Sequence, residues 1–113
     1  MSRGFLQSVS NYKEFRDKLK ASDCQLCPLS KSRTQIVVDR GNPYAKVLFV
    51  GEAPGQNEDL QGKAFVGRSG RLLDQILREL GFDTERDALI ANVVKCRPPK
   101  NRAPIPYEAE QCL

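Results

Sequence analysis

The sequence contains no histidine, and this absence narrows the chemistry open to the protein. Without an imidazole ring the chain cannot form a Ser-His or Cys-His catalytic pair, and it cannot bind a metal through histidine. Any proton transfer must therefore use carboxylates, lysines, thiols or water.

Long apolar runs are also missing. No segment approaches the roughly 18 consecutive apolar residues of a membrane-spanning helix, and residues 1–6 lack the long apolar core of a signal peptide. We therefore expect a cytoplasmic protein with no membrane partner. Disulfides are rare in that compartment, so the four cysteines need another explanation.

The composition is ordinary for one small globular domain. The chain has 113 residues, of which 40% are hydrophobic and 28% are charged. Its net charge of +4 weakly favours an anionic partner such as nucleic acid, although many basic domains bind nothing acidic.

Two apolar segments predict the strands of a sheet. Residues 47–50 predict a buried strand that enters a tight Gly-x-x-Pro-Gly loop, and residues 88–94 predict a second buried strand. Between them, leucine and isoleucine share one face of a helix that packs on the sheet, with Ser69 as its N-cap, Leu80 near its end and Gly81 just beyond. This order predicts a right-handed βαβ unit with parallel strands, and hence an α/β fold.

The amino-terminal part predicts one more helix. Residues 11–21 place three apolar side chains on one helical face, and Ser10 or Asn11 can cap the helix. We expect a short extended piece at residues 36–38 and a turn at residues 39–43.

The loop after the first strand carries the residues best suited to a ligand site. Ligands of open α/β sheets bind outside the carboxyl ends of the strands, and Gly51 and Gly55 let the backbone approach a ligand closely. Glu52, Glu58 and Asp59 place three carboxylates within eight residues. The alternative is an acidic surface loop that binds nothing.

Two further side chains have both a structural and a functional interpretation. Phe65 lies in a glycine-rich segment, where we expect close backbone packing; its ring either plugs the top of the sheet or stacks on a ring-shaped ligand such as an extruded base. Asn92 interrupts the second strand. Its amide either ties down a neighbouring loop or presents an acceptor beside a donor, the pair that matches O4 and N3–H of uracil. Cytosine has the opposite polarity at both atoms, and an amide rotated by half a turn would match it. The protein must therefore hold the amide in one orientation.

A basic, proline-rich loop follows the second strand. Lys100 and Arg102 can contact phosphates through charge, although a merely solvated loop fits the composition nearly as well. Four prolines between residues 98 and 106 exclude a helix there, and a final helix starts at Pro106.

The four cysteines fit one metal centre. Cys24 and Cys27 form a C-x-x-C pair, and Cys96 and Cys112 follow much later. Four thiolates suit zinc or an iron–sulfur cluster, and the spacing does not choose between them. Basic residues around Cys96 would offset the negative charge of a cluster. Arg33, in the polar segment after the C-x-x-C pair, is expected at the surface. Unligated cysteines and a dithiol redox pair are the remaining alternatives, the second weakened because no strand precedes the pair.

Taken together, these motifs resemble the amino-terminal part of the family 4, iron–sulfur uracil-DNA glycosylases. The resemblance covers residues 23–113 and leaves a separate helix within residues 1–22. Its carriers are Cys24-x-x-Cys27, Gly51-Glu52-Ala53-Pro54-Gly55-x-x-Glu58-Asp59, Phe65-Val66-Gly67, the segment from Asn92 to Arg102, and Cys112. Related members include domains associated with phage-type DNA polymerases.

The resemblance implies a three-layer α/β fold with a parallel sheet and a largely structural 4Fe–4S cluster. The implied cluster ligands are Cys24, Cys27, Cys96 and Cys112. Zinc is the second choice for this site.

The resemblance also implies base excision repair by a nucleoid-associated enzyme that flips uracil from single- or double-stranded DNA. Phe65 stacks on the base, Asn92 reads its edge, and Glu52 assists the water and the sugar cation while the N-glycosidic bond is hydrolysed. The remaining implied contacts are Gly51, Ala53 and Gly55 around the base and Lys100 and Arg102 on the DNA.

The chain departs from the family in two respects. Family members continue well beyond this length and carry a histidine that stabilises the leaving uracil, whereas this chain stops after about two core strands. We therefore expect a fragment with weak or no glycosylase activity, completed by a complementary chain or by the missing carboxyl-terminal half. The alternative is a metal-stapled nucleic-acid-binding domain without catalysis, and a zinc-stapled structural domain is third.

Overall fold

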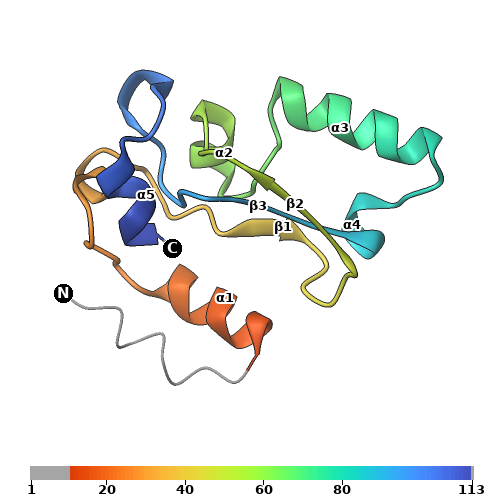
Figure 1. The fold of residues 1–113 in the computed structure, drawn as a ribbon, viewed down its shortest axis with the longest axis horizontal. Helices are drawn as coiled ribbons and strands as arrows, with labels where there is room; N and C mark the ends of the chain where they lie inside the picture. Colours follow the sequence, from red (N-terminus) through yellow and green to blue (C-terminus); the bar gives the residue numbers. More distant parts are fainter. Residues whose placement is uncertain (1–10, 113) are drawn as a thin grey trace.

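The computed structural model describes residues 11–112, which form three layers with α1 on one side of a small sheet and α3 on the other (Figure 1). The sheet has the strand order β1-β3-β2. None of the helices in this range has the length and apolar character needed to cross a membrane. The elements are α1 (Tyr12–Ala21), η2 (Pro28–Lys31), β1 (Asp39–Gly41), β2 (Val47–Gly51), α2 (Gln56–Gln61), α3 (Arg68–Glu79), α4 (Thr84–Asp87), β3 (Ala88–Asn92), η3 (Pro99–Asn101) and α5 (Pro106–Cys112).

The predicted parallel pair is formed by β2 and β3. Val47 pairs with Ala88 and Gly51 pairs with Asn92, so both strands end at the same edge of the sheet. The connection between them contains α3. The α/β prediction is therefore confirmed, and the register brings two predicted site positions side by side.

The third strand corrects the sequence prediction. We expected a turn at residues 39–43, but Asp39–Gly41 pairs antiparallel with β3, so the sheet is mixed rather than wholly parallel. The prediction failed because Asp, Gly, Asn and Pro, four of the five residues at positions 39–43, are typical of turns. Here Asp39 and Arg40 are buried against distant partners, and local composition does not reveal such partners.

The prediction that β2 is a buried strand is also wrong. Leu48 is 57% exposed and Val50 is 60% exposed, whereas Phe49 between them packs against the core cluster that contains Ile90. Alternate side chains of a strand point to opposite faces, and β2 lies at the edge of the sheet. One face of β2 is therefore open in the described part of the chain.

Two apolar clusters join the layers. Val37 and Val38 are both fully buried, yet they belong to different clusters, as expected for neighbouring residues of an extended segment. The cluster around Val38 contains Leu19 of α1, and the cluster around Val37 packs against Leu73 of α3. The segment before β1 is thus the centre of the core.

The first helix agrees with its prediction. Asn11 is the N-cap, and its side chain accepts a hydrogen bond from the backbone N–H of Glu14 at 2.9 Å. The alternative cap, Ser10, lies outside the described residues. Asp39 holds the helix on the sheet, since it accepts hydrogen bonds from the Tyr12 hydroxyl at 2.8 Å and from Arg16 Nε at 2.7 Å.

The central helix agrees only in part. Gly67, not Ser69, is the N-cap of α3, while Gly81 lies just beyond the end with a φ of 86°, as predicted. Leu77 is buried, but other members of the apolar face are open to solvent. The exposed members are Leu72 at 57%, Ile76 at 47% and Leu80 at 68%.

Candidate functional site

A pocket of about 440 Å³ opens at the carboxyl ends of β2 and β3. Gly51 lies directly beneath it: a Cβ atom at this position would stand 2.4 Å from Phe65 Cζ and 2.5 Å from Asn92 Oδ1. The structure therefore brings the predicted ligand residues into one place. Those that line the pocket are Glu52, Ala53, Gly55, Phe65 and Asn92.

Asn92 ends β3 and is 3% exposed. No described residue hydrogen-bonds with its side-chain amide, so the interpretation that it ties down a loop has no support in this range. No buried side-chain nitrogen or oxygen in residues 11–112 lacks a partner. The unpaired amide atoms of Asn92 must therefore face the open pocket, where a ligand can reach them.

The three loop carboxylates have separate surroundings. Asp59 is 2% exposed and accepts a hydrogen bond from the Thr34 backbone at 2.9 Å, which fixes α2 against the preceding segment. Glu58 is also committed to backbone groups. The Glu52 carboxylate is exposed at the pocket and accepts no hydrogen bond from another described residue. Of the three, Glu52 is the carboxylate left available to a ligand.

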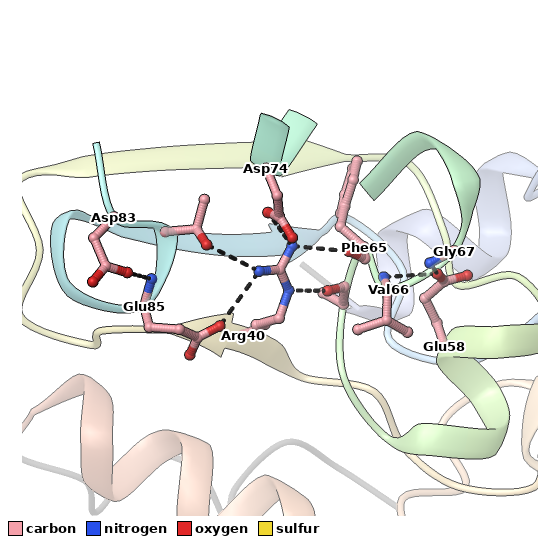
Figure 2. A network of polar contacts seen from close by, with 10 residues as sticks. Arg40, Glu58, Phe65, Val66, Gly67, Asp74, Asp83 and Glu85 are labelled. Carbon is pink, nitrogen blue, oxygen red and sulfur yellow. Dashed lines mark hydrogen bonds and ion pairs between the residues drawn. The ribbon is translucent and has the colours of Figure 1, made fainter. Parts of the chain in front are cut away.

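Glu58 joins two loops of the site. One of its oxygens accepts a hydrogen bond from the Gly55 N–H at 2.9 Å. The other accepts from the N–H groups of Val66 at 2.9 Å and Gly67 at 2.7 Å (Figure 2). The sequence indicated an acidic loop but not this use of a carboxylate.

Phe65 combines both interpretations offered for it. Its side chain packs against the apolar cluster below α3 and also lines the pocket. Its backbone has a φ of 55°, a left-handed conformation that is unusual for an aromatic residue. The carbonyl groups of Ala64 and Phe65 accept hydrogen bonds from the Arg40 guanidinium, both at 2.8 Å.

Sequence reasoning missed Arg40 because it placed this residue in a turn. A signal did exist, since the apolar run Ile36-Val37-Val38 ends only two residues before Arg40. Sequence reasoning also missed the first turn of α3. Ser69 and Gly70 line the pocket, and a Cβ atom on Gly70 would stand 1.8 Å from the Phe65 carbonyl oxygen. The glycine-rich segment thus does pack closely, as predicted.

The predicted DNA-contact residues differ in their surroundings. Lys100 is exposed, with a left-handed φ of 57°. Arg102 donates two hydrogen bonds of 2.8 Å to Glu108, which is 1% exposed, and these bonds lower the pKa of that carboxyl. Arg102 therefore holds α5 in place. The neighbouring Asn101 lines the pocket, which the sequence did not predict.

The cysteines gather around one apolar cluster, where α5 lies beside the segment that follows α1 (Figure 1). Cys96 is a buried member of this cluster, and the other three pack against it. None of the four forms a disulfide. Burial raises the pKa of Cys112, and charge on Cys27 and Cys24 raises it further, which places these thiols in one electrostatic neighbourhood.

Arg33 lies among the cysteines rather than at the surface. Its side chain is 7% exposed and donates to the Cys24 carbonyl oxygen at 2.6 Å and to Cys96 Sγ at 3.4 Å. Burial raises the pKa of Cys96 to about 11, and the Arg33 hydrogen bond opposes this rise. Within residues 11–112, no three potential ligand side chains converge closely enough for a single metal ion.

The amino-acid sequence was compared with those of known proteins. The chain is 50% identical over 93 residues to the type-4 uracil-DNA glycosylase of Thermotoga maritima, covering 82% of this chain and 48% of that protein. It is 51% identical over 89 residues to the type-4 uracil-DNA glycosylase of Archaeoglobus fulgidus, covering 79% and 44% respectively. A DNA polymerase of Bacillus phage SP01 is 32% identical over 74 residues, covering 66% of this chain and 8% of the polymerase.

The chain thus spans about half the length of the curated glycosylases it matches. The family model described as the uracil DNA glycosylase superfamily matches residues 38–113. This match includes β1, the pocket and two of the four cysteines. The chain belongs to the uracil-DNA glycosylase superfamily.

Proposed function

We propose that this chain supplies the uracil-binding part of a uracil-DNA glycosylase, which removes uracil from DNA in base excision repair. The observation that carries the proposal is the unpaired Asn92 amide, which faces a pocket also lined by Phe65 and Glu52. The three side chains supply edge recognition, a stacking face and a carboxylate. These are the parts that excision of a flipped base requires.

Recognition follows from hydrogen-bond polarity. The Asn92 carbonyl oxygen accepts from N3–H of uracil, and its NH₂ group donates to O4. Cytosine presents an acceptor at N3 and a donor at N4. The Asn92 oxygen would then face an acceptor and its NH₂ group would face a donor, so neither hydrogen bond forms. Phe65 supports the face of the base, and such stacking contributes about 1–3 kcal/mol per base.

Hydrolysis breaks the bond between uracil N1 and sugar C1′. Uracil leaves with the bonding electron pair as an anion, and the oxygen of a water molecule bonds to C1′. Glu52 accepts the proton that the water loses and offsets the positive charge of the sugar in the transition state. Backbone N–H groups after Gly51 donate to uracil O2 and stabilise the departing anion.

The cysteines suit a 4Fe–4S cluster better than a single zinc ion. Around one ion four sulfurs converge tightly, and the described residues offer no such convergence. In a cluster each thiolate binds a different iron, so the sulfurs stand further apart. Cys24, Cys27, Cys96 and Cys112 would hold the cluster, and its contribution when bound is to join three segments of the chain.

The remaining expectations concern partners. The proposed substrate is uracil-containing DNA, single- or double-stranded. Lys100 and Arg102 would lie near its phosphates. Binding to DNA would give the protein a nucleoid-associated location. The open face of β2 and the exposed part of α3 are apolar. We propose that polypeptide equivalent to the other half of the relatives covers them, and that without it glycosylase activity is weak or absent.

The test compares binding of matched single-stranded oligonucleotides that contain one uracil or one cytosine. We expect a preference for uracil of about tenfold or more, which Asn92→Asp abolishes because a carboxylate cannot donate to O4. Asn42→Asp, in the turn after β1, is the matched control and should keep the preference. Binding by the parent chain without a uracil preference would instead support a nucleic-acid-binding domain without catalysis.

A further inference from the structure

Arg40 has no role in base recognition as described above, yet it grips the loop that carries Phe65 (Figure 2). We propose that Arg40 is a positioning residue that aims the Phe65 ring into the pocket, and so strengthens the preference for a uracil base over an abasic site. The inference rests on the proposed function for its substrate. The grip itself is a property of the chain and is tested separately below.

The Arg40 contacts are unusually specific for a buried cation. The side chain is 7% exposed, and a buried guanidinium needs partners for its donors. Nε donates to the Ala64 carbonyl oxygen and Nη2 to the Phe65 carbonyl oxygen, both at 2.8 Å. The planar fork therefore fixes two consecutive peptide groups in one orientation, which a single point charge cannot do.

The same loop is held from its other end. Glu58 accepts hydrogen bonds from the N–H groups of Val66 and Gly67, the two residues that follow Phe65. Arg40 and Glu58 thus bind opposite backbone groups on either side of the aromatic residue. Figure 2 shows the two side chains flanking the loop from different elements, β1 and α2.

These hydrogen bonds are needed because the Phe65 backbone is strained, with a φ of 55°. A positive φ is disfavoured for a bulky residue and persists only when the surroundings over-determine it. Such conformations gather at ligand sites, where they pre-organise a contact group. The Phe65 ring ends at Gly51 beside Asn92, so a change of the loop would move the stacking face relative to the amide.

Arg40 also has partners outside the loop, and a test must separate these contacts. Nη2 pairs with Asp74 of α3 at 3.0 Å, and Nη1 lies 3.4 Å from both Thr84 and Glu85 of α4. Loss of Arg40 therefore also weakens the attachment of α3 and α4. A fall in stability alone does not demonstrate positioning.

The first measurement uses a double-mutant cycle on oligonucleotide binding. In the parent chain, Arg40→Met should lower the preference for a uracil base over an abasic site about tenfold, within the range of base–aromatic stacking. In a Phe65→Ala background the same substitution should change the preference less than about twofold, because the group that Arg40 positions is already gone. Arg40→Lys, which keeps the charge but loses the fork, should resemble Arg40→Met.

The second measurement does not need uracil. The chain contains no tryptophan, so Phe65→Trp introduces a single indole at residue 65, whose emission can be excited apart from that of the tyrosines. Adding Arg40→Met or Arg40→Lys should lower the fluorescence anisotropy of this indole and increase its quenching by iodide. Arg16→Met is the matched control, because Arg16 pairs with Asp39 and fastens α1 instead of the loop. It should reduce stability and leave the indole unchanged.

Two results would overturn the inference. One is an indole that stays equally immobile without Arg40 in a folded chain. The other is an Arg40 effect on uracil preference that persists undiminished in the Phe65→Ala background. If Arg40→Met does not fold, Arg40→Lys decides both measurements. If the parent chain shows no uracil preference, the proposed function fails, and the fluorescence result alone decides whether Arg40 orients residue 65.

Discussion

Two glycines shape this site because they have no side chain. Gly51 leaves room for the Phe65 ring and the Asn92 amide to meet above the strand end. Gly70 leaves room for the Phe65 carbonyl group beneath α3. Both glycines were suspected from the sequence, because glycine permits close backbone approach. What the sequence did not reveal is which side chains occupy the space.

The first prediction concerns Gly51→Ala. Its new Cβ atom would overlap Phe65 Cζ and Asn92 Oδ1, which are ends of side chains that can shift. We expect a folded protein, destabilised by about 1–3 kcal/mol through overpacking, with little uracil preference. Urea unfolding and oligonucleotide binding measure the two effects. Adding Phe65→Ala should recover part of the lost stability, and strictly additive losses would contradict this interpretation.

The second prediction concerns Gly70→Ala. Alanine normally stabilises a helix relative to glycine, but here the Cβ atom would meet the backbone of Phe65 at 1.8 Å. Backbone cannot give way as a side-chain end can, so we expect a net loss of about 3 kcal/mol, the upper end of ordinary overpacking. Gln75→Ala, at an exposed position of α3, should be nearly neutral. A stabilised Gly70→Ala variant would refute the close packing.

At the scale of elements, α1 and α5 are each held by a polar anchor in the sheet or in a loop. Asp39 holds α1 through Tyr12 and Arg16. Arg102 is paired with the buried Glu108 of α5. These anchors lie in segments that the sequence described as a turn and as a basic loop, so periodicity placed the helices but not their attachments.

The third prediction concerns the attachment of α1 at high pH. Burial and the hydrogen bond to Asp39 raise the pKa of Tyr12 above its ordinary value of 10.0. The folded state therefore favours the neutral phenol, and its contribution to stability is complete below pH 10 and declines above it. Chemical unfolding between pH 8 and 11 should show this decline.

The control for that prediction is a comparison of two tyrosines. Tyr12→Phe should remove most of the alkaline loss, because phenylalanine carries no titrating proton. Tyr44, which is 70% exposed, should behave like the parent protein after Tyr44→Phe. Equal pH profiles for the parent and Tyr12→Phe would show that this phenol does not couple to folding.

At the scale of the whole molecule, the chain has a closed side and an open side. The segment around Val37 and Val38 is fully buried between the layers. In contrast, Leu48 and Val50 at the sheet edge are more than half exposed. Monomeric proteins seldom leave such residues grouped on an edge strand. The open side agrees with a chain that spans about half the length of its glycosylase relatives.

The fourth prediction concerns the cysteines, which come from three separate segments. Anaerobically purified protein should contain iron and acid-labile sulfide in equal amounts and show a brown chromophore. Cys112→Ser should lose both elements and unfold at a lower temperature, since α5 would no longer be tied to the rest. Gln111→Ser, one residue away, should keep them. Zinc, or no metal in a folded parent chain, would refute the assignment of an iron–sulfur cluster.

Much of this protein follows from sequence alone. The 3.6-residue period located α1 and α3, and two continuous apolar runs located the parallel pair of strands, because these patterns follow from local backbone geometry. Gly51 was assigned to a ligand site because ligands of open α/β sheets bind outside the carboxyl ends of the strands, and the family resemblance added Phe65 and Asn92 to the same site. The complete set of four cysteines likewise indicated one shared centre.

Only the tertiary structure decided which charged residues are buried. Arg40 finds the Ala64 carbonyl 24 residues away, and Arg33 finds Cys96 across 63 residues. The composition of Asp39–Gly41 predicted a turn, but this segment is a strand. The apolar run Val47–Val50 predicted a buried strand, but one face of this strand is exposed. The physical reason is the same in each case. Burial and hydrogen bonding depend on partners brought together by the fold, and no window of neighbouring residues contains those partners.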